Sequence, residues 1–152
     1  WDILGSLPEM FHTVNGSLNQ ALKILNNETL LIRGGTSSVG LLASHIAKQI
    51  GAVVISTTRK REKIELLATN GSDHVLIDDG NLSEKIRQHF PQGVDNILEL
   101  IGTSTLKDSL QCAAQGGTVC MAGMLSETWS IDNFEPMEYI PSSVHLTIFF
   151  CF

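Results

Sequence analysis

The segment from Gly34 to Gly40 combines glycine with small hydroxyl residues, directly after an apolar run that ends at Arg33. Gly35 and Gly40 take the first and third glycine positions of the pattern G-x-G-x-x-G, and Ser37 takes the second. Where such a turn opens a helix, backbone N–H groups and the positive end of the helix dipole can bind a phosphate group. The segment predicts a pyrophosphate-binding turn, and a strand–helix turn without a ligand is the alternative. The residues expected at the pyrophosphate are Gly35, Thr36, Ser37, Ser38, Val39 and Gly40.

Two residues of this turn carry specific expectations. Ser37 has a β-carbon where the pattern has glycine, so the phosphate is expected to lie slightly further out or to accept a hydrogen bond from the serine hydroxyl. Gly40 has no β-carbon, which lets the helix pack closely against the strand.

Other nucleotide-binding motifs fit this chain poorly. A P-loop needs Lys and then Ser or Thr after its last glycine, but Leu41 and Leu42 follow Gly40. A methyltransferase would need an acid after the second apolar run, and none is there. The Tyr-x-x-x-Lys pair of short-chain dehydrogenases is absent, because Tyr139 is followed four residues later by Ser143.

A cluster of positive charge follows the second apolar run. Four of the ten Lys and Arg residues lie at positions 59–63. A site for NAD usually has Asp or Glu about 20 residues after the first glycine, where this chain has Thr57. Cationic side chains make charge-assisted bonds to a 2′-phosphate, each worth about 1.5–3 kcal/mol. The cluster predicts NADP(H), bound by Arg59 first and then by Lys63 and Thr58, with a solvated helix start as the alternative.

Six short apolar runs alternate with helical stretches along the chain. Most runs are apolar at consecutive positions, which is typical of parallel strands covered on both faces. The β-α-β-α order implies right-handed crossovers and an α/β fold with a doubly wound, six-stranded parallel sheet. The expected strands are Thr29–Arg33, Ala52–Thr57, His74–Asp78, Asn96–Ile101, Thr118–Ala122 and Val144–Phe150.

A further helix is expected before the first strand, with Pro8 in its first turn. Its apolar face would consist of Val14, Leu18, Leu22 and Leu25. The later helices are expected to end at glycine or proline, which interrupt helical backbone. These positions are Gly51, Gly71, Pro91 and Gly116.

The composition fits one domain, since 152 residues with 43% hydrophobic and 17% charged side chains supply a core. A formal net charge of −6 disfavours nucleic acid and anionic lipid as partners. No apolar run reaches the roughly 18 residues of a membrane-spanning helix, and no secretory signal is present. Three distant cysteines, Cys112, Cys120 and Cys151, are typical of reduced thiols in a cytoplasmic protein. The start at Trp1 indicates a piece of a longer protein.

Several polar residues are assigned no role in chemistry. The sequence Asp78-Asp79-Gly80 is typical of a turn and a helix cap. Glu99 lies within an apolar strand, where we expect it to take part in local hydrogen bonding. The five histidines are spread along the chain, and no Cys or His pair has metal-ligand spacing.

Taken together, these features resemble the nucleotide-binding domain of the medium-chain dehydrogenase/reductase superfamily, in particular the zinc-independent quinone oxidoreductases. The resemblance covers nearly the whole chain and implies a Rossmann fold over residues 1–152. The segments that carry it are Phe11–Ser17, Gly34–Gly40, Leu98–Gly102, Gly117–Val119 and Ala122–Met124.

The resemblance also implies further cofactor contacts. Thr13 would lie near the nicotinamide ribose, and the backbone of Phe149 would face the carboxamide. A helix-surface residue and an apolar sheet-edge residue are the respective alternatives. The other implied contacts are Leu100, Ile101 and Gly102 at the adenine ribose, and Gly123 and Met124 beside the nicotinamide.

The predicted function is that of the NADPH-binding domain of an oxidoreductase that passes hydride to a quinone or an activated enone. Since the catalytic β-rich domain of the family lies outside this chain, we expect cofactor binding without turnover and assign no catalytic residue or metal ligand. A non-catalytic dinucleotide sensor and the cofactor domain of a zinc-dependent alcohol dehydrogenase remain alternatives. The resemblance further implies a homodimer joined through the edge strand at residues 144–150.

Overall fold

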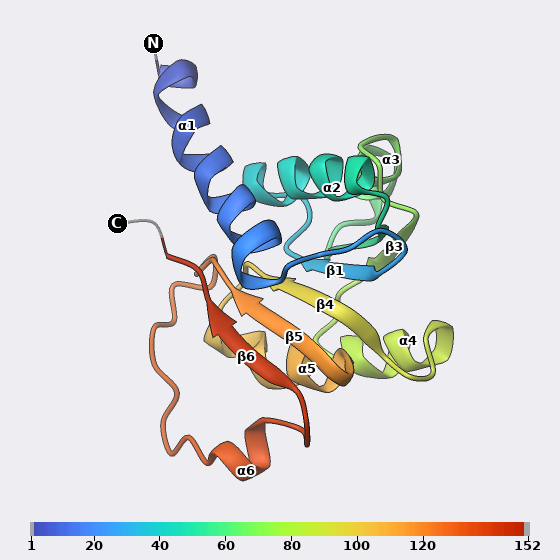
Figure 1. Cartoon of the computed structure of the whole chain (residues 1–152), viewed down its shortest axis with the longest axis vertical. Coiled ribbons are helices and arrows are strands. Elements are labelled where there is room, and N and C mark those ends of the chain that lie inside the picture. Colours follow the sequence, from blue (N-terminus) through green and yellow to red (C-terminus); the bar gives the residue numbers. More distant parts are fainter. Residues whose placement is uncertain (1, 151–152) are drawn as a thin grey trace.

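The computed structural model describes residues 2–150, which form a single six-stranded parallel sheet with helices on both faces (Figure 1). The strand order is β3-β2-β1-β4-β5-β6, which confirms the predicted doubly wound α/β fold. The strands are β1 (Thr29–Arg33), β2 (Val53–Thr58), β3 (His74–Ile77), β4 (Val94–Glu99), β5 (Ala113–Met121) and β6 (His145–Ile148).

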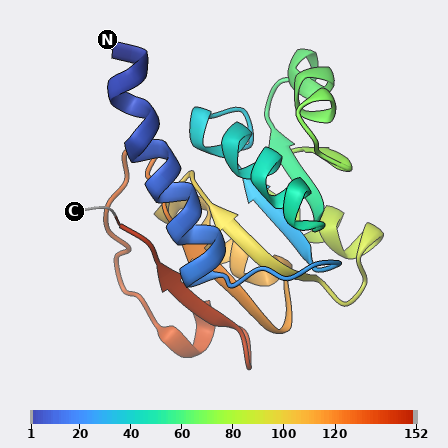
Figure 2. The same cartoon turned by 45° about the horizontal axis from the view of Figure 1, so that its top comes forward.

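Two helical layers cover the two faces of this sheet (Figures 1 and 2). Because side chains alternate along a strand, Leu30 and Ile32 pack in one core cluster, and Leu31 between them packs in the other. The first cluster lies under α1 and α2, and the second lies under α4 and α5. The helices are α1 (Asp2–Asn15), η1 (Gly16–Ala21), α2 (Ser38–Ile50), η2 (Arg61–Lys63), α3 (Ile64–Thr69), α4 (Leu82–His89), α5 (Thr103–Cys112) and α6 (Pro136–Tyr139).

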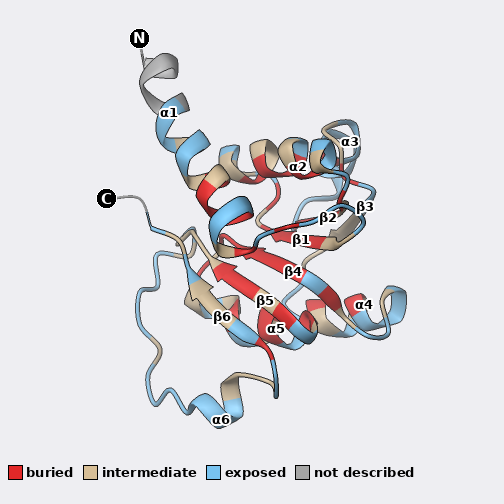
Figure 3. Ribbon diagram, in the orientation of Figure 1, coloured by how far each residue is buried: buried red, intermediate tan, exposed pale blue. Residues whose placement is uncertain are grey.

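The central strands are the most deeply buried part of the sheet (Figure 3). Leu30, Leu31, Ile97 and Leu98 have no exposed surface. This agrees with the consecutive apolar pattern, since neighbouring positions of these strands face different helical layers.

The first helix differs from its prediction in where it begins. It begins at Asp2, so Pro8 lies inside α1 and not in its first turn. Proline lacks the N–H that would donate to the carbonyl four residues earlier, so this helix continues at the loss of one backbone hydrogen bond. α1 projects beyond the sheet (Figures 1 and 2).

The apolar face predicted for this helix is also partly wrong. Leu18 and Leu22 are buried as predicted, but Leu25 is 64% exposed and Ile24 is buried in its place. The cause is the π-helical segment η1, in which the Leu22 N–H donates to the Ser17 carbonyl, five residues back. A π-helical turn contains more residues than an α-helical turn, and the helix ends soon after it. Both effects change which of the following residues face the sheet.

Five of the six strands have bounds that differ from the prediction, and the differences are largest at β4 and β5. β4 ends at Glu99, because the Ile101 and Gly102 N–H groups both donate to the Glu99 side chain and turn the chain out of the sheet. α5 ends at Cys112, well before Gly116, and β5 begins at the next residue. The Arg87 side chain donates to the carbonyls of Gln111 and Ala113, which provides hydrogen bonds where α5 ends.

Candidate dinucleotide-binding site

A cleft of about 670 Å³ lies at the carboxyl ends of β1 to β4. β1 has β2 on one side and β4 on the other, so the direction of winding changes here. In open α/β sheets this is where ligands bind. Four predicted contact residues line the cleft, namely Thr36, Thr58, Arg59 and Ile101.

The glycine-rich turn forms the end of the cleft at α2. Ser37 is the N-cap of α2: its Oγ accepts from the Gly40 N–H at 3.0 Å and donates to the Gly34 carbonyl at 2.8 Å. Its hydroxyl proton therefore serves the turn itself, and the expected hydrogen bond from this hydroxyl to a phosphate does not fit the geometry. The first N–H groups of α2, at Ser38 and Val39, have no intrahelical acceptor and are the groups suited to an anion.

The close packing expected at Gly40 is confirmed. A β-carbon on Gly40 would lie 2.6 Å from the Gly34 carbonyl oxygen and 2.9 Å from the Gly35 Cα. A β-carbon on Gly35 would lie 2.9 Å from Ser56 Cβ. Any side chain at Gly40 would force α2 away from β1 and open the turn.

The positive cluster divides between the cleft and the outer surface. Thr58 and Arg59 line the cleft at the end of β2. Lys63 lies in η2, is exposed, and is not among the cleft residues. Thr58 Oγ1 accepts from the Lys60 N–H at 3.1 Å, which holds the backbone on both sides of Arg59. The structure thus brings the first predicted cation to the cleft and leaves the second outside it.

The loop after β4 is shaped by Glu99, which the sequence analysis assigned only to local hydrogen bonding. Glu99 is fully buried and accepts from the N–H groups of Ile101 (2.7 Å) and Gly102 (3.1 Å) and from the Ser109 hydroxyl. Burial raises the pKa of this carboxyl group. Ile101 lines the cleft, whereas the side chain of Leu100 packs into the core.

The residues predicted at the nicotinamide lie outside this cleft, where β5, β6 and α1 meet. The Phe149 ring packs on Gly16, where a β-carbon would come within 1.8 Å of the ring, and contacts the His12 ring at 5.7 Å between centroids. The Phe149 N–H donates to the Met121 carbonyl. Thr13, Gly123 and Met124 are not among the cleft residues either. A β-carbon on Gly123 would lie 2.6 Å from the Leu100 carbonyl oxygen, so this loop packs closely on the end of β4.

Sequence reasoning missed a buried polar network that contacts the cleft residue Asp78. Arg33, at the end of β1, is fully buried and donates from Nε and Nη2 to both oxygens of Asp78, at 2.7 and 2.9 Å. Its Nη1 donates to Asp108 Oδ2 at 2.8 Å. Asp108 in turn accepts from the N–H groups of Leu82 and Ser83 at the start of α4. The sequence feature that could have indicated these buried ion pairs is a single arginine at the end of an apolar strand.

The turn predicted at Asp78-Asp79-Gly80 is confirmed, but the predicted helix cap is wrong, because Asn81 is the N-cap of α4 and Asp108 accepts from its first N–H groups. Asp78 accepts from the Gly80 N–H at 3.1 Å, and Asp79 accepts from the Asn81 N–H at 3.3 Å. Both aspartates also line the cleft and form ion pairs, which the turn motif did not indicate.

Ser126 is a further cleft residue that was not predicted. Its Oγ is buried and has no hydrogen-bond partner among the described residues. The hydroxyl lies close to Gly102, at the cleft wall opposite the cationic end of β2.

Metal-binding clusters and membrane-spanning helices are absent from the described part of the chain. Among residues 2–150 no cluster of three or more His, Cys, Asp or Glu side chains is placed to hold a metal ion. Over the same residues no helix is long and apolar enough to cross a membrane.

Burial raises the pKa of the Cys112 thiol to about 12 and that of the Cys120 thiol to about 11. Cys151 lies outside the described residues.

A doubly wound parallel sheet with a glycine-rich turn at its switch point defines a dinucleotide-binding type of domain. A sequence model of the zinc-binding dehydrogenases matches residues 38–151. The chain belongs to this family, which confirms its resemblance to the quinone oxidoreductase-like medium-chain dehydrogenases/reductases.

Individual relatives show how much of a family member this chain represents. A probable quinone oxidoreductase of Leishmania amazonensis is 27% identical over 139 residues, which are 90% of this chain and 39% of the relative. An NADP(+)-dependent 2-alkenal reductase of Nicotiana tabacum is 27% identical over 82% of this chain and 36% of the relative. A mycobacterial protein solved with NADPH superposes with a TM-score of 0.82 at 26% identity, over 91% of this chain and 43% of that one. The chain spans less than half the length of these relatives.

Proposed function

We propose that the chain is the NADPH-binding domain of an oxidoreductase that transfers hydride to a quinone or an activated enone. The observation that carries the proposal is the end of β2, where Thr58 and Arg59 line the cleft and no acid replaces them. The NADPH complex of the mycobacterial protein and the NADP(+) dependence of the tobacco reductase support this choice of cofactor.

The residues present fit such a cofactor at three places. The N–H groups of Ser38 and Val39 would hold the pyrophosphate at the start of α2, which lies close to β1 because Gly40 has no β-carbon. The guanidinium of Arg59 would hold the 2′-phosphate by charge-assisted hydrogen bonds. The buried Ser126 hydroxyl would gain a partner in a ribose hydroxyl.

These contacts separate the role of the cofactor from the role of this chain. The cofactor supplies the hydride when it is bound. This chain binds and orients it, with the adenosine half in the cleft and the nicotinamide half toward Gly123, Met124 and Phe149. Thr13 and Phe149 remain proposed contacts, which lie on α1 and at the end of β6.

Replacing Arg59 with alanine is expected to weaken NADPH binding about 10- to 100-fold, because one or two charge-assisted hydrogen bonds are lost. NADH, which has no 2′-phosphate, should bind as tightly as before. Titration calorimetry with both cofactors measures the two affinities. Lys63→Ala is the matched control, since it removes the same charge from outside the cleft. Equal losses for NADPH and NADH, or none for either, would contradict the phosphate assignment.

We further propose that residues 1–152 are the cofactor domain of a longer two-domain enzyme, which supports binding but no turnover alone. The relatives support this, since the chain covers 36–43% of the three described above. The buried thiols of Cys112 and Cys120 are in keeping with a reducing compartment such as the cytoplasm.

A homodimer joined through β6 is proposed as well. β6 pairs with β5 on one side and has no other strand partner among the described residues, and Ile148 is 64% exposed. Unpaired apolar edges favour strand pairing between copies. Light scattering over a range of concentrations should give the mass of two chains, and Ile148→Lys should give the mass of one. A wild-type mass of one chain at high concentration would count against the dimer.

A further inference from the structure

The end of β3 places two carboxylates beside the cationic side of the cleft. Thr58 of β2 is the register partner of Ile77 of β3, and the Asp78 N–H donates to the Thr58 carbonyl at 2.9 Å. Asp78, Asp79 and Arg59 all line the same cleft. Since adjacent strands lie about 4.8 Å apart, a phosphate held by Arg59 has these carboxylates one strand away.

Unpaired carboxylates at this distance would oppose a phosphorylated cofactor. A phosphate monoester carries a charge of about −1.5 to −2 at neutral pH. Its repulsion by a nearby carboxylate falls only with the inverse of their distance. The ribose hydroxyls of NADH carry no charge and meet no such repulsion, so bare acids here would favour NADH.

Both carboxylates are held in ion pairs, Asp78 by Arg33 of β1 and Asp79 by Lys85 of α4. Asp78 receives two hydrogen bonds from the buried guanidinium of Arg33, at 2.7 and 2.9 Å. Asp79 Oδ2 accepts from Lys85 Nζ at 2.6 Å, and Lys85 also donates to the Ile77 carbonyl at 2.8 Å. The hydrogen bond from Lys85 holds the pKa of Asp79 below its ordinary value.

We propose that Lys85 and Arg33 are positioning residues that determine the preference for the phosphorylated cofactor. By pairing with Asp79 and Asp78 they neutralise the charge that would repel the 2′-phosphate at Arg59. The inference rests on the proposed function, since it takes Arg59 as the phosphate ligand. Selection of the cofactor then depends on β3 and α4 as well as on β2.

The test is Lys85→Met, with Lys48→Met as its matched control. Lys48 forms a comparable ion pair with Asp73, which directly precedes β3 and therefore lies at the amino ends of the strands, away from the cleft. Asp73 also accepts from the N–H of Val54 near the start of β2. Both variants lower the net charge by one. Calorimetric titration of the full chain at low ionic strength should show NADPH binding about tenfold weaker in Lys85→Met, because Asp79 is left unpaired. NADH affinity should change less than about twofold, and Lys48→Met should change neither.

The double variant Lys85→Met with Asp79→Asn separates charge from structure. It lacks the carboxylate, so NADPH affinity should return to within about threefold of the wild type. It also lacks the bond from Lys85 to Ile77, so a persistent loss would mean that Lys85 acts through packing and would overturn the inference. An unchanged NADPH affinity in Lys85→Met would overturn it too.

Failure of this inference differs from failure of the proposed function. If the wild type prefers NADPH and loses that preference in Arg59→Ala, while Lys85→Met keeps it, only the role of Lys85 is wrong. If the wild type binds NADPH and NADH equally, the proposed phosphate site and this inference both fail.

Discussion

Replacing Arg33 with methionine is expected to lower the free energy of unfolding by about 3–5 kcal/mol. Methionine fills much of the same space but leaves Asp78 and Asp108 unpaired, with side chains only 10% and 20% exposed. Removing the cation costs more free energy of unfolding than the loss of its hydrogen bonds alone, because the desolvated carboxylates remain. Urea denaturation gives the change from the midpoint and the m-value.

Two further variants test whether charge or packing carries this effect. Arg33→Lys keeps the charge, but one ammonium group cannot reproduce the bonds of Nε, Nη1 and Nη2 to two carboxylates, so an intermediate loss is expected. Arg33→Met combined with Asp78→Asn should lose less than the sum of the single changes. A loss under about 1 kcal/mol in Arg33→Met would show that the group is not a stabilising centre.

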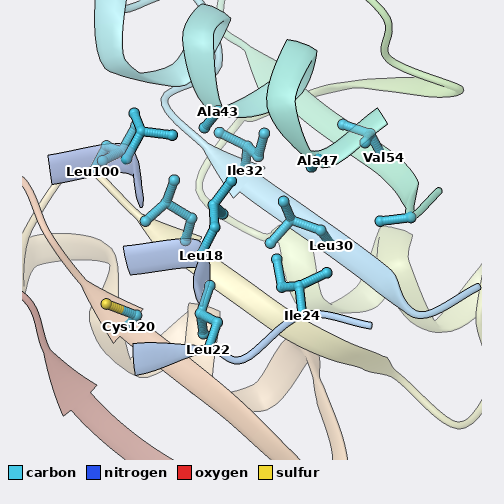
Figure 4. Packing of buried hydrophobic residues seen from close by; sticks show 13 residues of the cluster. Leu18, Leu22, Ile24, Leu30, Ile32, Ala43, Ala47, Val54, Leu100 and Cys120 are labelled. Atoms are coloured by element: carbon cyan, nitrogen blue, oxygen red, sulfur yellow. The ribbon is translucent and has the colours of Figure 1, made fainter. Parts of the chain in front are cut away.

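Leu18→Ala is expected to lower the free energy of unfolding by about 2–5 kcal/mol, since it leaves a cavity in a closely packed core. Leu18 has no exposed surface and belongs to the same core cluster as Leu30, Ile32 and Leu100 (Figure 4). Because it lies in η1, its loss should also loosen the π-helical turn next to the end of β6. Thermal and urea unfolding of the variant measure the effect.

Leu25→Ala is the matched control, because the sequence pattern placed both leucines on one face. Leu25 is 64% exposed, so its truncation should change the free energy of unfolding by less than about 0.5 kcal/mol. Similar losses in the two variants would indicate a regular α-helix through Leu25 and would contradict the π-helical segment.

Several features of the fold could be predicted from local patterns. The apolar runs predicted six strands because a strand buried on both faces needs consecutive apolar residues, and β1 has the predicted bounds. Gly51 ends α2 with φ of 93°, as its position predicted, because this backbone region favours glycine. The close packing at Gly40 was predicted from its place in the turn, and it is confirmed because an added β-carbon would lie 2.6 Å from the Gly34 carbonyl oxygen.

Pairings between distant segments could not be predicted in this way. Arg33 and Asp78 meet because β1 and β3 both flank β2, an arrangement that no local pattern records. The position of Arg59 at the cleft, with Lys63 outside it, depends on how the chain turns after Thr58 into η2. Ile24 replaces Leu25 in the core because η1 widens the helix, which a period of 3.6 residues does not anticipate.

The sequence by itself therefore determined the class of fold, the glycine-rich turn and the cationic cluster, because each depends on residues close together in the chain. Only the tertiary structure decided which charges face the cleft and which are neutralised. The physical reason is that an ion pair depends on distances of a few ångströms, and the order of strands in the sheet sets those distances.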